Sequence, residues 1–231
     1  EEVAAGVVID CTGDGDVSAR AGAPFEIGRK EDGLMQPMSL HFRLGGVDMA
    51  RMPPREEINL LYARARVAGV ITNPRENLLW FDTTYPDQVH FNTTRIVRVD
   101  GTNRDDLTAA EIEGRRQALE YARFLIEQVP GYEHAALGSL STQIGVRESR
   151  RIVGEYVLSA DDFQSARKFD VGIAKSCYPI DIHNPAGVGV TLERLGPGEY
   201  HEIPYRCLVP KRVDGLLVAG RVLIDRSRRP A

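Results

Sequence analysis

Asp181 and His183 stand two residues apart in the mainly apolar segment 178–183. Alternate side chains of a strand point to the same face, so a strand here would place both groups on one side. An aspartate beside a histidine can orient and charge the imidazole, which makes a useful acid–base pair. The alternative is a structural histidine, and that is our interpretation of the other four, which have no comparable setting: His41, His90, His134 and His201.

Three arginines, Arg147, Arg150 and Arg151, follow the short apolar run 144–146. Guanidinium groups bind carboxylates bidentately and stabilise developing negative charge, so an enzyme acting on an acidic or carbonyl compound could use one of them. The alternative is ion pairing at the surface with neighbouring glutamates, which contributes little to stability. Arg147 and Arg150 are our candidates for the site, and Arg147 is preferred because it follows the apolar run directly.

A turn of glycine and aspartate, Thr12-Gly13-Asp14-Gly15-Asp16, follows an apolar run and is called the 12–16 turn below. Two glycines at the carboxyl end of a strand allow the backbone to approach a ligand closely. Free N–H groups there could meet phosphate or ribityl oxygens. The alternative is a turn in which Asp14 or Asp16 caps the following helix, expected over 17–21.

The two ends of the chain predict strands of one parallel sheet. Residues 3–10 indicate a buried strand, and residues 215–219 are nearly all apolar, as in a central strand. Both runs end in glycine turns. We therefore expect them to lie in the same sheet although they are far apart in the sequence.

The middle of the chain predicts antiparallel strands mixed with helices. Thr108 and Glu111 fit a capping box at the start of a helix over 108–129. Four apolar residues of that segment recur at helical spacing: Ile112, Leu119, Ala122 and Ile126. A second helix is expected over 56–68, and strands are expected over 38–44, 78–82, 88–92, 95–100, 178–182 and 205–209. The fold class is therefore α/β, with α+β character in the middle.

Composition narrows the class of protein. The 231 residues are 42% hydrophobic and 27% charged, which is typical of a soluble globular protein. A formal net charge of −4 argues against a nucleic-acid partner, and no apolar run approaches the roughly 20 residues of a membrane span. Three widely spaced cysteines form neither a disulfide framework nor a zinc site, and we expect them to be small buried residues in a reducing, cytoplasmic compartment. No metal site is expected.

Several segments, taken in order, resemble a family of FAD-dependent oxidoreductases within the glutathione-reductase-like flavoproteins. The matching segments are 8–16 with 21–24, 36–44, 145–154, 178–183, 203–206 and 215–221. The resemblance implies FAD as cofactor and a small organic substrate that gives a hydride to the flavin. It implies that the 12–16 turn, Gly220 and Arg221 lie near the cofactor, and that the acid–base pair and the arginines lie near the substrate.

The resemblance also implies a domain organisation. Residues 1–36 would be part of a Rossmann-like FAD-binding domain, 37–204 an inserted substrate domain, and 205–231 a return to the first domain. That family opens with a G-x-G-x-x-G turn for the FAD pyrophosphate, which this sequence does not contain. We therefore expect a fragment that binds FAD weakly or not at all and that associates through its first strand into a homo-oligomer. The rival interpretation is a cofactor-free binding or assembly module.

Overall fold

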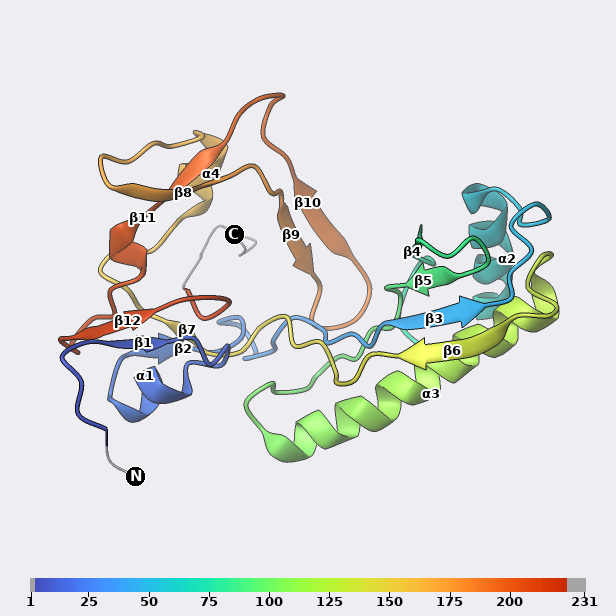
Figure 1. Ribbon diagram of the computed structural model, residues 1–231, viewed down its shortest axis with the longest axis horizontal. Coiled ribbons are helices and arrows are strands. Elements are labelled where there is room, and N and C mark those ends of the chain that lie inside the picture. Colours follow the sequence, from blue (N-terminus) through green and yellow to red (C-terminus); the bar gives the residue numbers. More distant parts are fainter. Residues whose placement is uncertain (1–2, 224–231) are drawn as a thin grey trace.

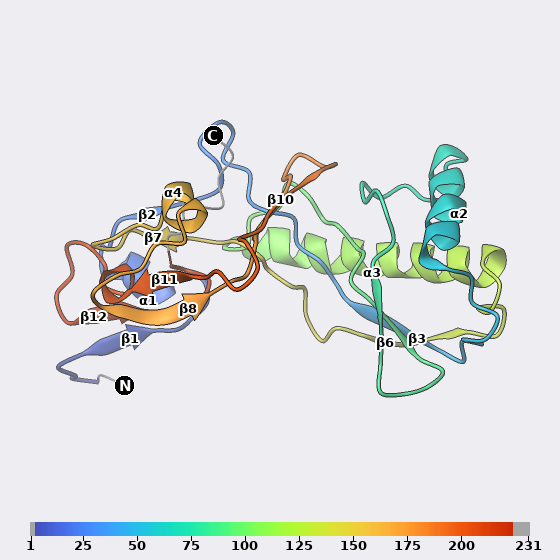
Figure 2. The same ribbon diagram turned by 90° about the horizontal axis from the view of Figure 1, so that it is seen from above.

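The computed structural model describes residues 3–223, which form an elongated molecule (Figures 1 and 2). The helices are α1 (Asp16–Arg20), α2 (Arg55–Val67), α3 (Arg104–Gln128), α4 (Ala160–Gln164) and the 3-10 helix η1 (Tyr205–Cys207). The strands are β1 (Val8–Asp10), β2 (Phe25–Glu26), β3 (Phe42–Gly45), β4 (Trp80–Asp82), β5 (Val89–Phe91), β6 (Ala136–Leu140), β7 (Arg151–Ile152), β8 (Gly172–Ser176), β9 (Ile180–His183), β10 (Val190–Glu193), β11 (His201–Pro204) and β12 (Leu216–Val218). Helices combined with small, mostly antiparallel sheets give the protein α+β character.

One end of the molecule is a four-stranded antiparallel sheet with the order β4-β5-β3-β6. The helices α2 and α3 lie beside this sheet (Figure 1). Strands β3 and β5 bury alternate residues, and Phe42 and Phe91 stack with ring centroids 4.8 Å apart. These residues belong to the largest hydrophobic core, whose members lie between Met38 and Ile144. The predicted mixture of antiparallel strands and helices in this region is confirmed.

Helix α3 begins four residues before the predicted start. The side chain of Asn103 accepts hydrogen bonds from the backbone nitrogens of two residues in the first turn, so Asn103 is the cap. The predicted capping box is wrong because Thr108 already lies inside the helix and Glu111 instead accepts a hydrogen bond from the backbone of Ile144. Two residues of the predicted apolar stripe, Ile112 and Leu119, are exposed.

The other end of the molecule joins the two ends of the chain. Strand β1 pairs in parallel with β12, in the register Val8 with Leu216, which confirms the predicted shared sheet. The prediction that residues 3–10 are buried is wrong, since Ile9 is 60% exposed and only Asp10 of β1 is buried. Among residues 3–223, β1 has a strand partner on one side only, which leaves its outer residues in contact with solvent.

Two other predicted strands are replaced by different structure. Residues 95–100 form a single bridge, between Ile96 and Met38, and Arg98 has a φ of 60°, which does not fit a strand. At 205–209 the chain forms η1, closed by a hydrogen bond from the nitrogen of Leu208 to the carbonyl of Tyr205 at 2.8 Å. The strand of this region, β11, ends just before, at Pro204.

A hairpin of β9 and β10 lies between the two ends of the molecule (Figure 1). Its turn begins at Asn184, whose backbone nitrogen donates a hydrogen bond to the carbonyl of Gly189. The pairs β2 with β7 and β8 with β11 complete the sheets of the described chain. Ile182 of β9 lines a cavity together with residues from the segments 28–36 and 147–151.

Two further observations concern the cysteines and the helices of the described residues. Cys207 is buried as predicted, whereas Cys11 and Cys177 are exposed, so the prediction of three buried cysteines is wrong for two of them. No helix within residues 3–223 is long and apolar enough to cross a membrane.

Candidate functional site

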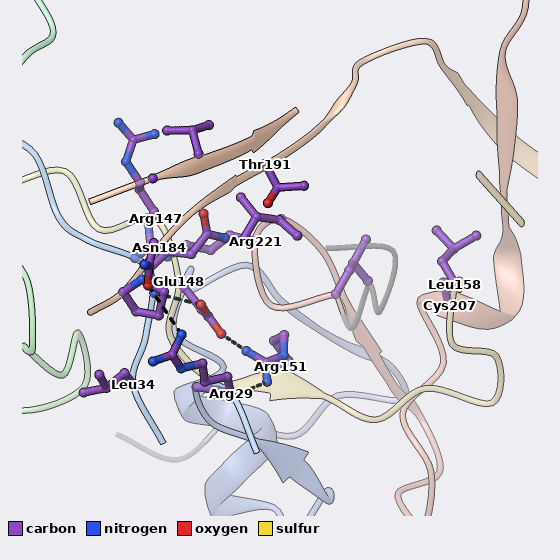
Figure 3. Close-up of a pocket in the computed structure, with 18 of the residues that line it drawn as sticks. Arg29, Leu34, Arg147, Glu148, Arg151, Leu158, Asn184, Thr191, Cys207 and Arg221 are labelled. Atoms are coloured by element: carbon purple, nitrogen blue, oxygen red, sulfur yellow. Dashed lines mark hydrogen bonds and ion pairs between the residues drawn. The ribbon is translucent and has the colours of Figure 1, made fainter. Parts of the chain in front are cut away.

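A cavity of about 600 Å³ lies where the β9–β10 hairpin meets the loop 28–36, the segment 147–151 and the end of β12. This volume is typical of small-molecule sites, which usually measure about 300–1,000 Å³. Its apolar lining includes Leu34, Leu158, Ile182, Val190, Ile203 and Leu223. In Figure 3, Arg29, Arg147 and Glu148 lie toward one end of the cavity, and Leu158 and Cys207 lie toward the other.

Four arginines contribute to the lining: Arg29, Arg147, Arg151 and Arg221. Three of them form ion pairs with a carboxylate, namely Arg29 with Asp32, Arg151 with Glu148, and Arg221 with Asp14. The fourth, Arg147, donates a hydrogen bond from Nη2 to Oγ of Ser39 at 3.1 Å. Burial lowers the pKa of the Arg147 guanidinium, while Asp181 raises it. The cavity therefore combines apolar walls with fixed positive charge.

The 12–16 turn is anchored by Asp10, a buried residue that the sequence analysis did not select. Its carboxylate accepts hydrogen bonds from the backbone and the hydroxyl of both Thr12 and Ser18, at 2.6–3.0 Å. The residue that caps α1 is Gly15, which has no side chain, so the prediction that Asp14 or Asp16 caps this helix is wrong. The sequence holds a signal for this residue, because Asp10 ends an apolar run that predicts burial. A buried carboxylate requires hydrogen-bond donors, so nearby donors such as Thr12 and Ser18 could have been expected to contact it.

Both glycines of the turn have a positive φ, which L side chains rarely adopt, and each has a close neighbour. Gly13 has a φ of 83°, and a Cβ there would lie 3.1 Å from Nη2 of Arg221. Gly15 has a φ of 65°, and its Cβ would lie 2.9 Å from Cδ1 of Ile152. The residues of the turn do not line the cavity themselves, but Arg221 does, and its Nη2 lies 2.8 Å from Oδ1 of Asp14. Arg221 thus links the turn to the cavity.

Arg150 also contacts the turn. Its Nη1 donates to the carbonyl of Asp14 at 3.0 Å and to Oδ1 of Asp16 at 2.8 Å. The neighbouring Ser149 donates to the carbonyl of Gly13. Arg150 is not among the cavity-lining residues. The structure therefore places it where it holds the 12–16 turn in position.

Asp181 and His183 share one face of β9, whereas Ile182, which lines the cavity, lies on the other. Nε2 of His183 is 3.5 Å from Oδ1 of Asp181. Burial, reinforced by Arg147, lowers the pKa of His183 to about 4. The pair lies behind the cavity wall and interacts with Arg147 from that side.

Sequence reasoning missed Arg95, which is 2% exposed and has no motif around it that marks it. Its Nη2 lies 3.1 Å from Nδ1 of His183, and its Nη1 donates to the carbonyl of Gly187 at 2.6 Å. Arginine has donors only, so Nδ1 of His183 accepts this bond and its proton resides on Nε2. Arg95 therefore fixes the tautomer of the histidine.

The lining of the cavity fits one end of a flavin cofactor. Gly220 follows β12 directly, has a φ of 92°, and a Cβ at this position would meet no heavy atom within 4 Å. The backbone at Gly220 is therefore open to a planar group, and the flanking Arg221 supplies positive charge. Gly189, in the hairpin turn, lines the same cavity with a φ of 113°.

Comparison with known proteins gives one match. A family model described as FAD dependent oxidoreductase matches residues 1–224, almost the whole chain. No curated protein and no solved structure matches the sequence. This match shows that the chain belongs to the FAD-dependent oxidoreductase family, whose cofactor is FAD.

Proposed function

We propose that this protein oxidises a small organic substrate by hydride transfer to the flavin of FAD, and that the two meet in the cavity beside Gly220. The observation that carries the proposal is the open backbone of Gly220, which faces the cavity at the carboxyl end of β12. In open α/β sheets, ligands bind outside the carboxyl ends of the strands. A glycine at this position allows the closest approach of a ring.

On the cofactor side, bound FAD supplies the redox chemistry, and the protein supplies binding and orientation. We assign the 12–16 turn, Gly220 and Arg221 to this side. The ion pair between Arg221 and Asp14 supports the assignment because it couples the turn to the cavity wall. Arg150 acts here as a positioning residue, since it holds the turn through two hydrogen bonds.

On the substrate side, we assign Arg147 to substrate binding and the pair Asp181 and His183 to positioning Arg147. The apolar walls of the cavity displace water and thereby strengthen the electrostatic interactions of Arg147. A histidine with a pKa of about 4 stays neutral at neutral pH. Its Nδ1 is already occupied by Arg95, which favours a positioning role over proton transfer.

The test is an absorbance scan of the purified protein for flavin bands, followed by titration with FAD. The substitution Gly220→Leu should weaken FAD binding about tenfold or more, because the new side chain occupies the space of the ring. Gly22→Leu is the matched control, since Gly22 has a φ of 88° and equally open surroundings but does not line the cavity. Equal FAD affinity of the two variants would overturn the proposed location of the cofactor.

A further inference from the structure

The loop 28–36 forms one wall of the cavity and contains a closed turn. The backbone nitrogen of Arg29 donates to the carbonyl of Leu34 at 3.0 Å, and that of Gly33 donates to the carbonyl of Arg29 at 2.8 Å. A Cβ on Gly28, which has a φ of 53°, would lie 2.0 Å from the carbonyl oxygen of Gly33, so the two sides of the turn touch. The turn can therefore move as one unit. The loop residues that line the cavity are Gly28, Arg29, Leu34 and Gln36.

The base of the loop is fixed to the segment 147–151. Nη2 of Arg151 donates to the carbonyl of Gly28 at 2.5 Å, which holds one end of the loop. Oε2 of Glu148 accepts a hydrogen bond from the backbone nitrogen of Gln36 at 2.9 Å, which holds the other end. Arg151 and Glu148 also form an ion pair with each other, and their side chains are only 11% and 14% exposed. Solvent screens such a pair less than an exposed one, so both ends of the loop are held firmly at one place.

The loop is held more weakly to the β9–β10 hairpin on the opposite side of the cavity. Nη1 of Arg29 donates to Oδ1 of Asn184 at 3.4 Å (Figure 3). Within the described part of the chain, the other hydrogen bond from hairpin to loop runs from the backbone nitrogen of His183 to Oε1 of Gln36 at 3.3 Å. Both distances exceed the usual range of about 2.7–3.2 Å for an N–H···O bond. The contact with the hairpin is therefore the one that opens first.

Both side chains of the contact between Arg29 and Asn184 keep other partners when it breaks. Nε and Nη2 of Arg29 donate to the two carboxylate oxygens of Asp32, at 2.8 and 2.6 Å. Oδ1 of Asn184 accepts from the backbone nitrogen of Ala186 at 3.0 Å, and its Nδ2 donates to the carbonyl of Val188 at 2.7 Å. Opening therefore costs about one long hydrogen bond, and Nη1 of Arg29 can turn to water in exchange.

We propose that the loop 28–36 is a gate on the cavity. The ion pair of Glu148 and Arg151 is the fixed base on which the loop swings. The contact of Arg29 with Asn184 is the latch that holds the loop closed. Loops of this kind control the entry and release of ligands in many enzymes. The gate goes beyond the proposed function, because it opens and closes with or without a bound flavin.

The experiment measures the distance between two nitroxide labels by double electron–electron resonance. The labels are attached at Glu31→Cys, in the exposed part of the loop, and at Leu192→Cys, on the exposed side of β10, in a chain whose three native cysteines are replaced by serine. With Arg29 present, a shorter distance should dominate over a longer one. Arg29→Gln should raise the ratio of longer to shorter distances on the order of threefold to tenfold, the factor for one net hydrogen bond.

Three further variants separate the latch from the base. Arg51→Gln is the matched control, because it removes one positive charge from an exposed arginine that pairs with Glu133, and it should leave the distances unchanged. Arg29→Lys keeps the charge but has a single ammonium in place of the fork, so it should open the gate as Arg29→Gln does, and it replaces that variant if Arg29→Gln does not fold. Glu148→Gln removes the ion pair at the base and should broaden the longer distances.

Access to the cavity is measured separately, by the reaction of the Cys207 thiol with 5,5′-dithiobis(2-nitrobenzoate) in a chain that carries Cys11→Ser and Cys177→Ser. Cys207 is buried and lines the cavity, so Arg29→Gln should speed its reaction by the same factor as it raises the open population. One unchanged distance in all variants, or equal effects of Arg29→Gln and Arg51→Gln, would overturn the gate. A longer distance with unchanged reactivity of Cys207 would also overturn it, because the loop would then move without controlling the cavity.

Discussion

The carboxylate of Asp10 holds Ser18 by two hydrogen bonds, at 2.7 Å to its backbone nitrogen and 2.6 Å to its hydroxyl. Asp10 ends β1 and Ser18 lies in α1, so this contact ties the strand to the helix across the 12–16 turn. Burial alone would raise the pKa of Asp10, but the hydrogen bonds from Ser18 and Thr12 lower it below its usual value. The contact therefore stabilises the folded chain through an ionised carboxylate.

Replacing Asp10 by asparagine should lower the free energy of unfolding by about 1–3 kcal/mol, the range for hydrogen bonds to a charged group and for leaving a buried group unsatisfied. The amide nitrogen of the new side chain would face donors, so part of the network would be lost. Urea unfolding at pH 7 measures the change. Asp170→Asn, at an exposed aspartate, should have little effect, and equal losses for the two variants would contradict the prediction.

The contribution of Asp10 should also depend on pH. Its pKa is lower in the folded than in the unfolded chain, so the stabilisation is complete above the unfolded value, about 3.9. It is lost as the pH falls through the folded value. The difference in unfolding free energy between wild type and Asp10→Asn should therefore be constant from about pH 7 to 5 and shrink below about pH 4. A difference that grows on acidification would show that the sign is wrong.

Gly15→Ala should destabilise the protein in two ways, through its φ of 65° and through the contact of the new Cβ with Cδ1 of Ile152 at 2.9 Å. Backbone strain of this kind costs about 1–3 kcal/mol, and overpacking adds to it. Gly22→Ala has the same strain without a close neighbour, so it separates the two effects. Thermal unfolding should show a larger loss for Gly15→Ala, partly restored by Ile152→Val. Equal losses would exclude the steric contact.

Local patterns in the sequence were enough to predict the pairing of the chain ends. The apolar run at Leu216 and its partner at Val8 both precede glycine turns, and buried parallel strands have this form. The helix expected over 56–68 is α2, which follows Pro54, and proline is suited to the start of a helix. The shared face of Asp181 and His183 followed from the period of two in a strand.

Contacts between distant segments could not be predicted in this way. At 205–209 the local sequence also suits a strand, although the chain forms a 3-10 helix at Tyr205. At the start of α3 the sequence also suits a cap at Thr108, although Asn103 is the cap. The buried position of Arg95 depends on His183 and Gly187, which are about ninety residues away in the chain. The exposure of Cys11 depends on which strands cover β1, and no property of the cysteine itself determines it.

His183 provides the last prediction, because its low pKa depends on neighbours that can be removed singly. Burial and Arg147 lower the pKa of the ring from 6.5 to about 4, while Asp181 opposes the shift, and Arg95 and Arg75 contribute less. Since the folded value is the lower one, the unfolded chain binds the proton more readily. This group should therefore reduce stability as the pH falls from about 6.5 toward 4, by on the order of 1–3 kcal/mol.

An NMR titration of the His183 ring should give a midpoint of about 4 in wild type. Arg147→Gln should raise the midpoint, because it removes a cation that opposes protonation, and Asp181→Asn should lower it further. His183→Gln should remove the loss of stability that His183 causes between about pH 6.5 and 4. His134→Gln, at an exposed histidine, is the control and should leave that loss unchanged. A midpoint that does not respond to Arg147 would mean that the two side chains do not interact, and the positioning role of His183 would have to be abandoned.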